Sequence, residues 1–515
     1  MDRPEKREEL STEQTKKDLK RIAVLGGTLG RENRYYVRGQ VVDVGIDDVM
    51  KAEGIWDFVT GILKGKELEI TPFLDFSLAP VRKPILKAEI YDESSKLVYT
   101  SDAIYADEDG FFSLEMSHPL PKGEYVLQLI ITGLNSYRQY SRDIARINRN
   151  ENSEIARAYI LGKSKLRILD ENYTSYITTS DIDQTYLSTD IHSNKGKFAT
   201  LFETPTQKLP LPGMPTLYQR LRRDTENTPL TFISASPHFF RRTLLATINY
   251  HEINSESLHL KYLDGTVKGV LDKIIGTVSN PKDFFSSGMR QAMERTRKFF
   301  SSSYQSLFDQ MAYKLTILLR SRLYFPKNAK EILMGDNTES DYMIFTLYQL
   351  ILEGKISTAV LEQYLYELNF LGRDAITRDN AKTICQLAEE NIKLHGKINP
   401  VALVLINQTE HGPTEKEMRF KVESAISPIL RLDETANPHF YGTQGSIGFS
   451  VILACKGIIN QASILDVVSS TVGEWIEGKV VNDVYLLNWV KNLHLPDFAQ
   501  ETREWLVDVV ERTIQ

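Results

Sequence analysis

Short segments between Tyr35 and Gly133 alternate apolar and polar positions. They read YYVRGQVVDV, ILKAEIYD, KLVYTSDAIYA, GFFSLEM and EYVLQLIITG. A period of two is typical of strands that bury one face, and Asp109–Gly110 and Lys122–Gly123 supply turn residues between them. The pattern predicts a small antiparallel β-sandwich domain over residues 35–160. Because the segment lacks a cluster of histidine, cysteine and carboxylate side chains, we expect the domain to have a binding or packing role.

From about Leu166, short apolar runs alternate with amphipathic segments such as MPTLYQRLRRD and AYKLTILLRSRL. The strand candidates are Ile177–Asp181, Pro229–Ser236, Glu331–Asp336 and Val401–Asn407. Strands that alternate with helices favour an α/β fold with a doubly wound parallel sheet. We predict this domain over residues 161–446.

Both ends of the chain have helical patterns. The charged segment MDRPEKREELSTEQTKKDLKRI lacks the apolar core of a signal peptide and predicts a solvated arm over residues 1–34. VLGGTLG (residues 24–30) lacks the G-x-G-x-x-G spacing and the lysine of nucleotide-binding loops, so a flexible joint is the favoured interpretation. Residues 447–515 are mostly amphipathic and predict a helical C-terminal region.

Composition narrows the class of protein. A chain of 515 residues exceeds one ordinary domain, and 42% hydrophobic with 25% charged residues is a normal globular balance. The net charge of −6 does not favour a nucleic-acid partner. Cys385 and Cys455 lie in apolar helical contexts and are interpreted as reduced core thiols of a cytoplasmic protein. No apolar run approaches the roughly 18–20 residues that span a bilayer.

Polar residues gather where the first strand of this sheet ends, in SDIDQT. Ligands of parallel sheets bind at the carboxyl ends of the strands. There Asp181 and Asp183 can divide the work of a nucleophile and a general acid/base, and Thr185 can hydrogen-bond within the turn. An aspartate-rich surface turn is the alternative interpretation.

The next two candidates are a serine and a lysine. Ser234 follows an apolar strand and offers a hydroxyl and a backbone N–H to a phosphate oxygen; the alternative is a helix N-cap before Pro237. Lys314 is flanked by apolar residues and can neutralise a phosphoryl group, whereas a snorkelling surface lysine is the alternative.

The third strand ends in LMGDNTESD, where Gly335 is expected to allow a tight turn. Asp336 and Asp341 would add two carboxylates to Asp181 and Asp183. Four such charges repel one another and need a divalent cation, and oxygen ligands beside a phosphate suit Mg²⁺. These four aspartates are the predicted metal site.

The motif D-x-D-x-T, a serine, a helical lysine and G-D-x-x-x-x-D, in this order, resemble the haloacid dehalogenase-like (HAD-like) hydrolases over about Leu166 to Phe345. SDIDQT, LPGMPTLYQRL, FISASPHFFRR and FPKNAKEILMGDNTESD are more closely similar to phosphatidate phosphatases of the fungal actin-patch type, which are related to the lipins. In that group a β-sandwich commonly precedes the hydrolase domain. Gln184, where the family usually has aspartate, and helical insertions at about 262–313 and 345–398 depart from the pattern.

The resemblance implies a role for each candidate. Asp181 would be the nucleophile, Asp183 the general acid/base and Thr185 a loop-steadying residue. Ser234 and Lys314 would hold phosphoryl oxygens. Asp336 would bind Mg²⁺ directly, and Asp341 would act through water or by orienting a ligand.

The expected function is therefore a Mg²⁺-dependent phosphatase that works through an aspartyl-phosphate, with phosphatidate as the favoured substrate. A phosphatase of soluble monoesters and a non-catalytic lipid-binding or scaffold protein are the alternatives; the oligomeric state is open. FFSSGMRQAMERTRKFFSSSYQSLF (residues 284–308) suits a basic amphipathic helix. It predicts either peripheral membrane contact or a cap or core helix with a solvated basic side.

Overall fold

The computed structural model describes residues 21–25, 28–43, 79–81, 83–134, 160–188, 205–261, 310–368, 376–430, 440–477 and 483–514. The described residues up to Ile168 form one compact unit, and the described residues from Leu169 onward form a second. The predicted amphipathic helix 284–308 lies outside the described residues, as does most of the insertion predicted over 262–313.

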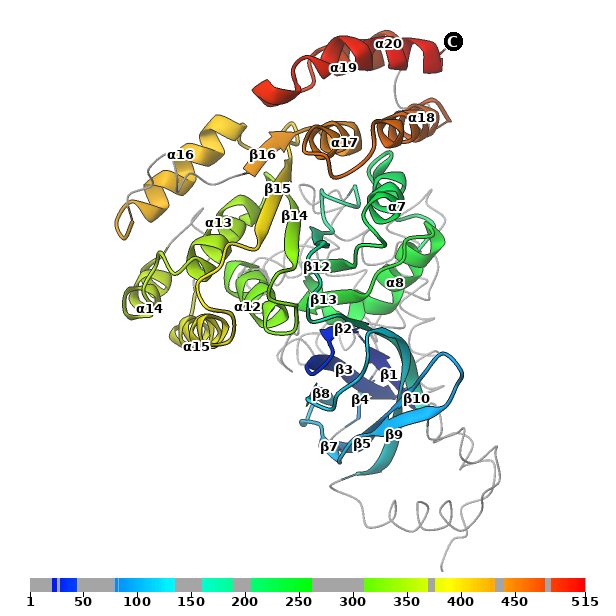
Figure 1. Cartoon of the computed structure of the whole chain (residues 1–515), viewed down its shortest axis with the longest axis vertical. Coiled ribbons are helices and arrows are strands. Elements are labelled where there is room, and N and C mark those ends of the chain that lie inside the picture. Colours follow the sequence, from blue (N-terminus) through cyan, green and yellow to red (C-terminus); the bar gives the residue numbers. More distant parts are fainter. Residues whose placement is uncertain are drawn as a thin grey trace, which may run out of the picture. The chain divides into compact units, whose positions relative to one another are not determined.

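Two antiparallel sheets make up the first unit (Figure 1). One contains β1 (Arg21–Leu25), β3 (Tyr35–Asp43), β4 (Ala79–Pro80) and β8 (Phe111–Met116). The other contains β2 (Thr28–Arg31), β5 (Pro84–Tyr91), β6 (Leu97–Thr100), β7 (Ile104–Tyr105), β9 (Gly123–Leu134) and β10 (Ile160–Leu169). Alternate residues such as Val37 and Val41 of β3 and Leu86 of β5 are buried in one hydrophobic cluster. The alternating pattern therefore identified the buried faces correctly.

Two predictions for this unit need correction. Residues 21–25 and 28–31 are strands of the sheets, so that part of the predicted helical arm is wrong. β10 pairs antiparallel with β9, although its residues were assigned to the α/β domain. The pairing holds β10 in the first unit because its alternating side chains, including Leu166 and Ile168, join that unit's hydrophobic cluster.

A six-stranded parallel sheet forms the centre of the second unit. Its order is β13 (Ser257–Lys261), β12 (Leu230–Pro237), β11 (Tyr176–Asp181), β14 (Lys330–Asp336), β15 (Val401–Asn407) and β16 (Phe440–Thr443). Every neighbouring pair is parallel. The direction of strand progression reverses between β11 and β14, and such a switch point is where parallel sheets bind ligands at the strand ends. The four predicted strands are confirmed; the short β13 and β16 were missed.

Helices lie on both faces of this sheet (Figure 1). α7 (Met214–Asp224), α8 (Arg241–Tyr250), α17 (Gly445–Cys455) and α18 (Gln461–Glu477) share one hydrophobic cluster with strand residues such as Phe232 and Met334. α12 (Gln310–Arg322), α13 (Asp341–Leu352) and α15 (Arg378–His395) pack on one another, with α14 (Thr358–Glu367) beside α15. α12 also contacts β12, and α13 contacts β14 and β15. The remaining helical segments are η1 (His238–Phe240), α16 (Glu415–Ile426), α19 (Asp483–Lys491), η3 (Asp497–Ala499) and α20 (Thr502–Ile514).

The predicted helical C-terminal region is not separate from the sheet. Ile447 and Phe449 of α17 are buried in the same cluster as the strands of the parallel sheet. Cys385 is buried, but Cys455 is exposed, so the prediction of a core thiol is wrong for Cys455. Among the described residues no helix is both long and apolar enough to cross a membrane.

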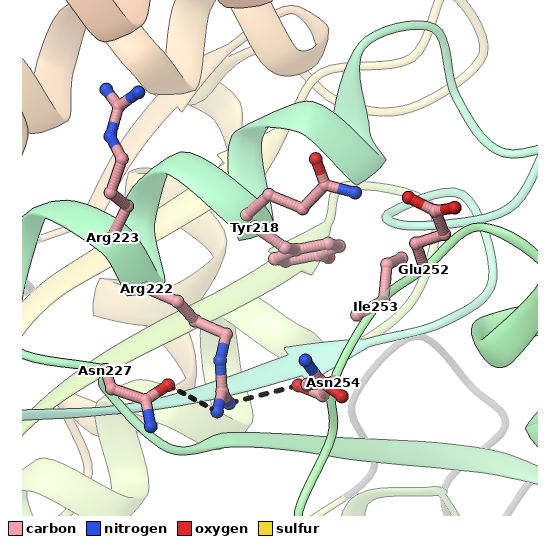
Figure 2. A pocket seen from close by; sticks show the side chains of 8 residues that line it. Tyr218, Arg222, Arg223, Asn227, Glu252, Ile253 and Asn254 are labelled. Carbon is pink, nitrogen blue, oxygen red and sulfur yellow. Dashed lines mark hydrogen bonds between the residues drawn. The ribbon is translucent and has the colours of Figure 1, made fainter.

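A pocket of about 330 Å³ lies beside α7 (Figure 2). It is lined by Tyr218, Gln219, Arg222, Arg223, Asn227, Glu252, Ile253 and Asn254. The Arg222 guanidinium is held by Asn227 and by the Glu256 carboxylate at 2.9 Å, so its charge is already compensated. None of the residues predicted to carry chemistry lines this pocket.

Candidate active site

The turn after β11 places Asp181 and Asp183 at the switch point of the sheet. Asp181 is the last residue of β11 and is 1% exposed. In the turn Gln184 has φ 56°, and its backbone N–H donates to the Leu187 carbonyl at 2.9 Å. The Asn407 side chain at the end of β15 donates to the Gln184 carbonyl at 2.7 Å. The left-handed backbone conformation of Gln184 and the hydrogen bond from Asn407 thus shape the turn.

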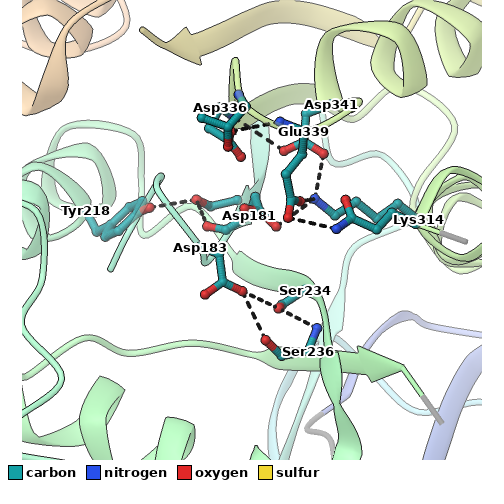
Figure 3. A network of polar contacts seen from close by, with 12 residues as sticks. Asp181, Asp183, Tyr218, Ser234, Ser236, Lys314, Asp336, Glu339 and Asp341 are labelled. Atoms are coloured by element: carbon teal, nitrogen blue, oxygen red, sulfur yellow. Dashed lines mark hydrogen bonds and ion pairs between the residues drawn. The ribbon is translucent and has the colours of Figure 1, made fainter. Parts of the chain in front are cut away.

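Asp183 is held by two serines at the end of β12 (Figure 3). The Ser234 and Ser236 hydroxyls donate to its Oδ2 at 3.1 and 3.0 Å, and the Ser236 backbone N–H donates to Ser234 Oγ at 3.0 Å. β12 continues to Pro237 and α8 begins at Arg241, so Ser234 is not a helix N-cap. Ser236 was missed, although residues two apart on a strand point to the same side.

Thr185 is placed differently from its prediction. Its side chain is fully buried, and its backbone N–H donates to the Ile182 carbonyl at 3.4 Å. Its hydroxyl has no hydrogen-bond partner within the described part of the chain. The hydrogen bonds inside the turn are therefore between backbone groups, the Asn407 side chain adds one from outside it, and the predicted Thr185 side-chain hydrogen bond is absent there.

Lys314 connects α12 to the end of β11, to the β14–α13 loop and to the first turn of α13. Its ammonium lies 2.8 Å from Asp181 Oδ1, 2.6 Å from Asp341 Oδ1 and 3.1 Å from Glu339 Oε2 (Figure 3). The side chain is 0% exposed, which rules out the snorkelling alternative. Burial alone would lower the pKa of Lys314, but the surrounding carboxylates outweigh it and the pKa is well above its usual value. Lys314 therefore carries its positive charge.

The loop from β14 to α13 orients Asp336. Asp336 Oδ1 accepts hydrogen bonds from the Thr338 backbone N–H at 2.5 Å, from the Thr338 hydroxyl, and from the Glu339 backbone N–H at 3.1 Å. A Cβ added at Gly335 would lie 2.5 Å from Asp341 Oδ2. Gly335 is thus required for the close approach of the Asp341 carboxylate, and the predicted need for a tight turn is not the reason.

Four carboxylates gather here: Asp181, Asp336, Glu339 and Asp341, each offering an oxygen within 4.8 Å of the others. Within the described residues, neither Asp181 Oδ2 nor Asp336 Oδ2 has a hydrogen-bond partner, although both are buried. Burial raises the pKa of Asp181 and of Asp336 well above the usual range, and neighbouring carboxylates add to the rise while Lys314 opposes it. Unpartnered buried oxygens fit a divalent cation, so this cluster can hold one.

The observed cluster differs from the predicted metal ligands in one member. Glu339 belongs to it and was missed; Asp183 was predicted and lies outside it, turned toward the two serines. Glu339 sits between two aspartates in DNTESD, and its side chain reaches Lys314 only because the loop folds back toward α12. The excess of acidic residues in that short loop was the available signal.

A second layer of aromatic residues supports the β11 end. The Ser180 and Tyr218 hydroxyls are 2.6 Å apart, and the Tyr186 hydroxyl lies 2.7 Å from His251 Nδ1. The rings of Tyr186 and Tyr218 meet edge to face at 6.0 Å. Burial lowers the pKa of His251, which favours the neutral ring in this contact. These contacts limit movement of the turn that carries Asp183.

This chain was compared with curated proteins, with solved structures and with protein families. Curated proteins gave no match. Among solved structures, CopC from Methylosinus trichosporium OB3b aligns with a TM-score of 0.14 and 13% identity, over 29% of this chain and 97% of its own. A β-glucuronidase from Parabacteroides merdae aligns with a TM-score of 0.18 and 7% identity, over 51% of this chain and 33% of its own. Such low scores carry no argument about fold or function.

The family model described as "Phosphatidate phosphatase APP1, catalytic domain" matches residues 176–284. The matched segment begins with β11 and includes Asp181, Asp183 and Ser234. This match over residues 176–284 confirms the resemblance to the phosphatidate phosphatase family that was predicted from the sequence.

Proposed function

We propose that this protein is a Mg²⁺-dependent phosphatase that forms an aspartyl-phosphate on Asp181 and converts phosphatidate to diacylglycerol. The observation that carries the proposal is the state of the Asp181 carboxylate. Lys314 contacts its Oδ1 at 2.8 Å, while its buried Oδ2 has no hydrogen-bond partner within the described residues. A nucleophile needs such an available oxygen, held by a positive charge at the end of a rigid strand.

In the proposed reaction an Asp181 oxygen attacks phosphorus as the bond from phosphorus to the alcohol oxygen breaks. Asp183 gives its proton to that oxygen, so the alcohol leaves neutral. Asp183 then takes a proton from water, and this water attacks the phosphorus of the aspartyl-phosphate, which restores Asp181 and releases phosphate. Ser234 and Ser236 hold Asp183 by Oδ2, which leaves Oδ1 for the proton.

The chain's own cation, Lys314, lies where it can compensate the charge of the transferring group. Lys314 neutralises phosphoryl oxygens beside Asp181. Bound Mg²⁺ would supply Lewis-acid stabilisation of the same charge, and the buried Oδ2 of Asp336, which has no hydrogen-bond partner within the described residues, would be offered to it. Asp341 aligns Lys314 from the first turn of α13.

The proposed function includes a fold assignment. The strand order of the parallel sheet, helices on both faces and the site at the switch point support a HAD-like doubly wound domain. The two antiparallel sheets around one hydrophobic cluster support the β-sandwich assignment.

The test uses the purified full-length chain with phosphatidate in vesicles and, separately, a panel of short soluble phosphate monoesters. Phosphate release from phosphatidate that requires Mg²⁺ supports the proposal. Release from soluble esters alone favours a soluble phosphomonoesterase. Vesicle binding without release of phosphate favours a lipid-binding or scaffold protein, because neither Asp181 nor Asp183 is needed for binding alone.

Peripheral membrane contact through residues 284–308 is a separate part of the proposal. Replacing Phe285, Met289 and Phe300 with serine is expected to reduce binding to anionic vesicles and activity on phosphatidate within them. Activity on a soluble ester is expected to change little. Equal loss on both substrates would instead indicate a structural helix.

A further inference from the structure

Glu339 places an additional carboxylate on the lysine of the candidate active site. Its side chain extends from the β14–α13 loop to the Lys314 ammonium beside Asp181 (Figure 3). Glu339 Oε2 lies 3.1 Å from Lys314 Nζ, and Oε1 accepts a hydrogen bond from Gln310 Nε2 at 2.8 Å. Both oxygens of Glu339 thus accept hydrogen bonds from donors on α12.

Carboxylates surround the Lys314 ammonium in the substrate-free protein. The ammonium donates hydrogen bonds to Glu339 and Asp341 and forms an ion pair with Asp181 at 2.8 Å, and it has only three N–H bonds in all. Asp181 is anchored at the end of β11 and Asp341 in the first turn of α13, and both side chains are 0–1% exposed. Glu339 is 15% exposed and sits on a loop. Of the three partners, Glu339 is the one that can move away without disturbing a strand or a helix.

The surroundings of Glu339 are also anionic. Burial raises the pKa of Glu339, Lys314 opposes the rise, and the negative charges of Asp341 and Asp183 add to it. The charge of Glu339 in turn raises the pKa of Asp181. Glu339 therefore lies within electrostatic reach of both proposed catalytic aspartates, Asp181 and Asp183. A phosphoryl group in transfer between Asp181 and an alcohol protonated by Asp183 would need this same region.

We propose that Glu339 is an internal competitor of the substrate: in the substrate-free protein its carboxylate occupies the position on Lys314 that a phosphoryl oxygen takes. This inference rests on the proposed phosphatase function and deepens it. Substrate binding must displace Glu339, so Glu339 weakens the binding of any phosphate group. After hydrolysis, Glu339 returns to Lys314 and displaces the product phosphate ion.

The test measures binding of inorganic phosphate by calorimetry in the presence of Mg²⁺. Glu339→Gln removes the charge, and Glu339→Asp keeps the charge on a side chain too short to reach Lys314. Both variants are expected to bind phosphate roughly tenfold more tightly, since a hydrogen bond to a charged group no longer has to be broken. Tighter binding by Glu339→Gln alone would overturn the proposal, because simple charge repulsion would then suffice.

Two further measurements separate this role from others. Binding of Mg²⁺ alone is measured on the same variants, and a loss of tenfold or more in Glu339→Asp would overturn the proposal in favour of a metal ligand. Gln310→Ala removes the amide that holds Glu339 and is expected to tighten phosphate binding by a smaller factor. If the Glu339 variants do not fold, Gln310→Ala replaces them in the phosphate-binding test. Unchanged phosphate affinity in Gln310→Ala would then overturn the proposal.

Kinetics distinguish failure of this inference from failure of the proposed function. In Glu339→Asp, KM for a phosphate monoester is expected to fall more than kcat, because the competitor acts on binding. A wild-type protein that hydrolyses the ester while the variants show unchanged KM and unchanged phosphate affinity would overturn the role of Glu339 alone. A wild-type protein that neither hydrolyses the ester nor binds phosphate would overturn both.

Discussion

Lys314 and Asp181 form an ion pair at 2.8 Å in which both side chains are almost completely buried. The pair joins helix α12 to the end of the central strand β11. Two buried charges are tolerated only when each is compensated, and removing one partner leaves an uncompensated charge in a region of low dielectric constant. The same contact therefore contributes to stability and places a positive charge beside the proposed nucleophile.

Replacing Asp181 with asparagine is expected to lower turnover by several orders of magnitude, because an amide cannot form the acyl-phosphate. The fold is expected to survive, since Lys314 keeps Asp341 and Glu339 as partners. Phosphate release and thermal unfolding are measured on the same preparation. Activity close to wild type in folded Asp181→Asn protein would contradict the mechanism.

Replacing Asp183 with asparagine is also expected to lower turnover severely, because the variant loses proton transfer.

Replacing Lys314 with methionine tests the compensation of charge. The variant leaves Asp181, Glu339 and Asp341 without their shared cation and is expected to lower the free energy of unfolding by about 3–5 kcal/mol. Denaturant unfolding measures this loss, and added Mg²⁺ is expected to recover part of it. The control is Lys393→Met, at an exposed position in helix α15, which is expected to change stability little. Equal effects of the two substitutions would refute the structural role of Lys314.

Gly335→Ala tests the close packing of the β14 end. The new Cβ would lie 2.5 Å from Asp341 Oδ2, so the Asp341 carboxylate must move and its contact with Lys314 is expected to weaken. We expect a loss of at least tenfold in activity. Gly473→Ala in helix α18 is the matched control, because its Cβ meets no atom within 4 Å. That variant is expected to gain up to roughly 1 kcal/mol of stability from helix propensity.

The acidic cluster makes stability depend on pH in a stated direction. Burial raises the pKa of Asp181, Asp336 and Glu339 in the folded protein. The folded state thus holds these protons more tightly than the unfolded chain does, and unfolding releases them. In the presence of a chelator, their contribution to stability is therefore present below the ordinary carboxylate range and is lost as pH rises through the raised pKa values.

This pH dependence is measured as Tm between acid and neutral pH, with chelator and with Mg²⁺. Asp336→Asn removes one carboxylate from the cluster and isolates its effect from the rest of the protein. Relative to this variant, the wild type is expected to lose stability as pH rises in chelator and to regain it with Mg²⁺. A difference between the two proteins that is independent of both pH and Mg²⁺ would argue against a cation site. Activity is likewise expected to vanish in excess chelator and return with Mg²⁺.

The local pattern of the sequence predicted much of the fold. Short, mostly apolar runs that end in polar residues identified β12, β14 and β15, because a strand buried on both faces favours apolar side chains. β11 (YITTSD) was also predicted, although Thr178, Thr179 and Ser180 are polar and buried. The short β13 and β16 lack such a run and were missed. Alternation identified strands of the first unit, but the charged composition before Tyr35 hid β1 and β2.

The sequence by itself determined which residue types stand at the strand ends, and with them the positions of Asp181, Asp183, Ser234 and Asp336. Burial and strand periodicity are local properties, so they can be predicted from neighbouring residues. The tertiary structure alone decided the partners: Lys314 with Asp181, Glu339 with Lys314, and Asp183 with Ser236. These contacts join segments that are distant in the chain or loops whose path follows no periodic pattern. Their geometry depends on how α12 and the β14–α13 loop pack at the sheet end, which residue spacing does not encode.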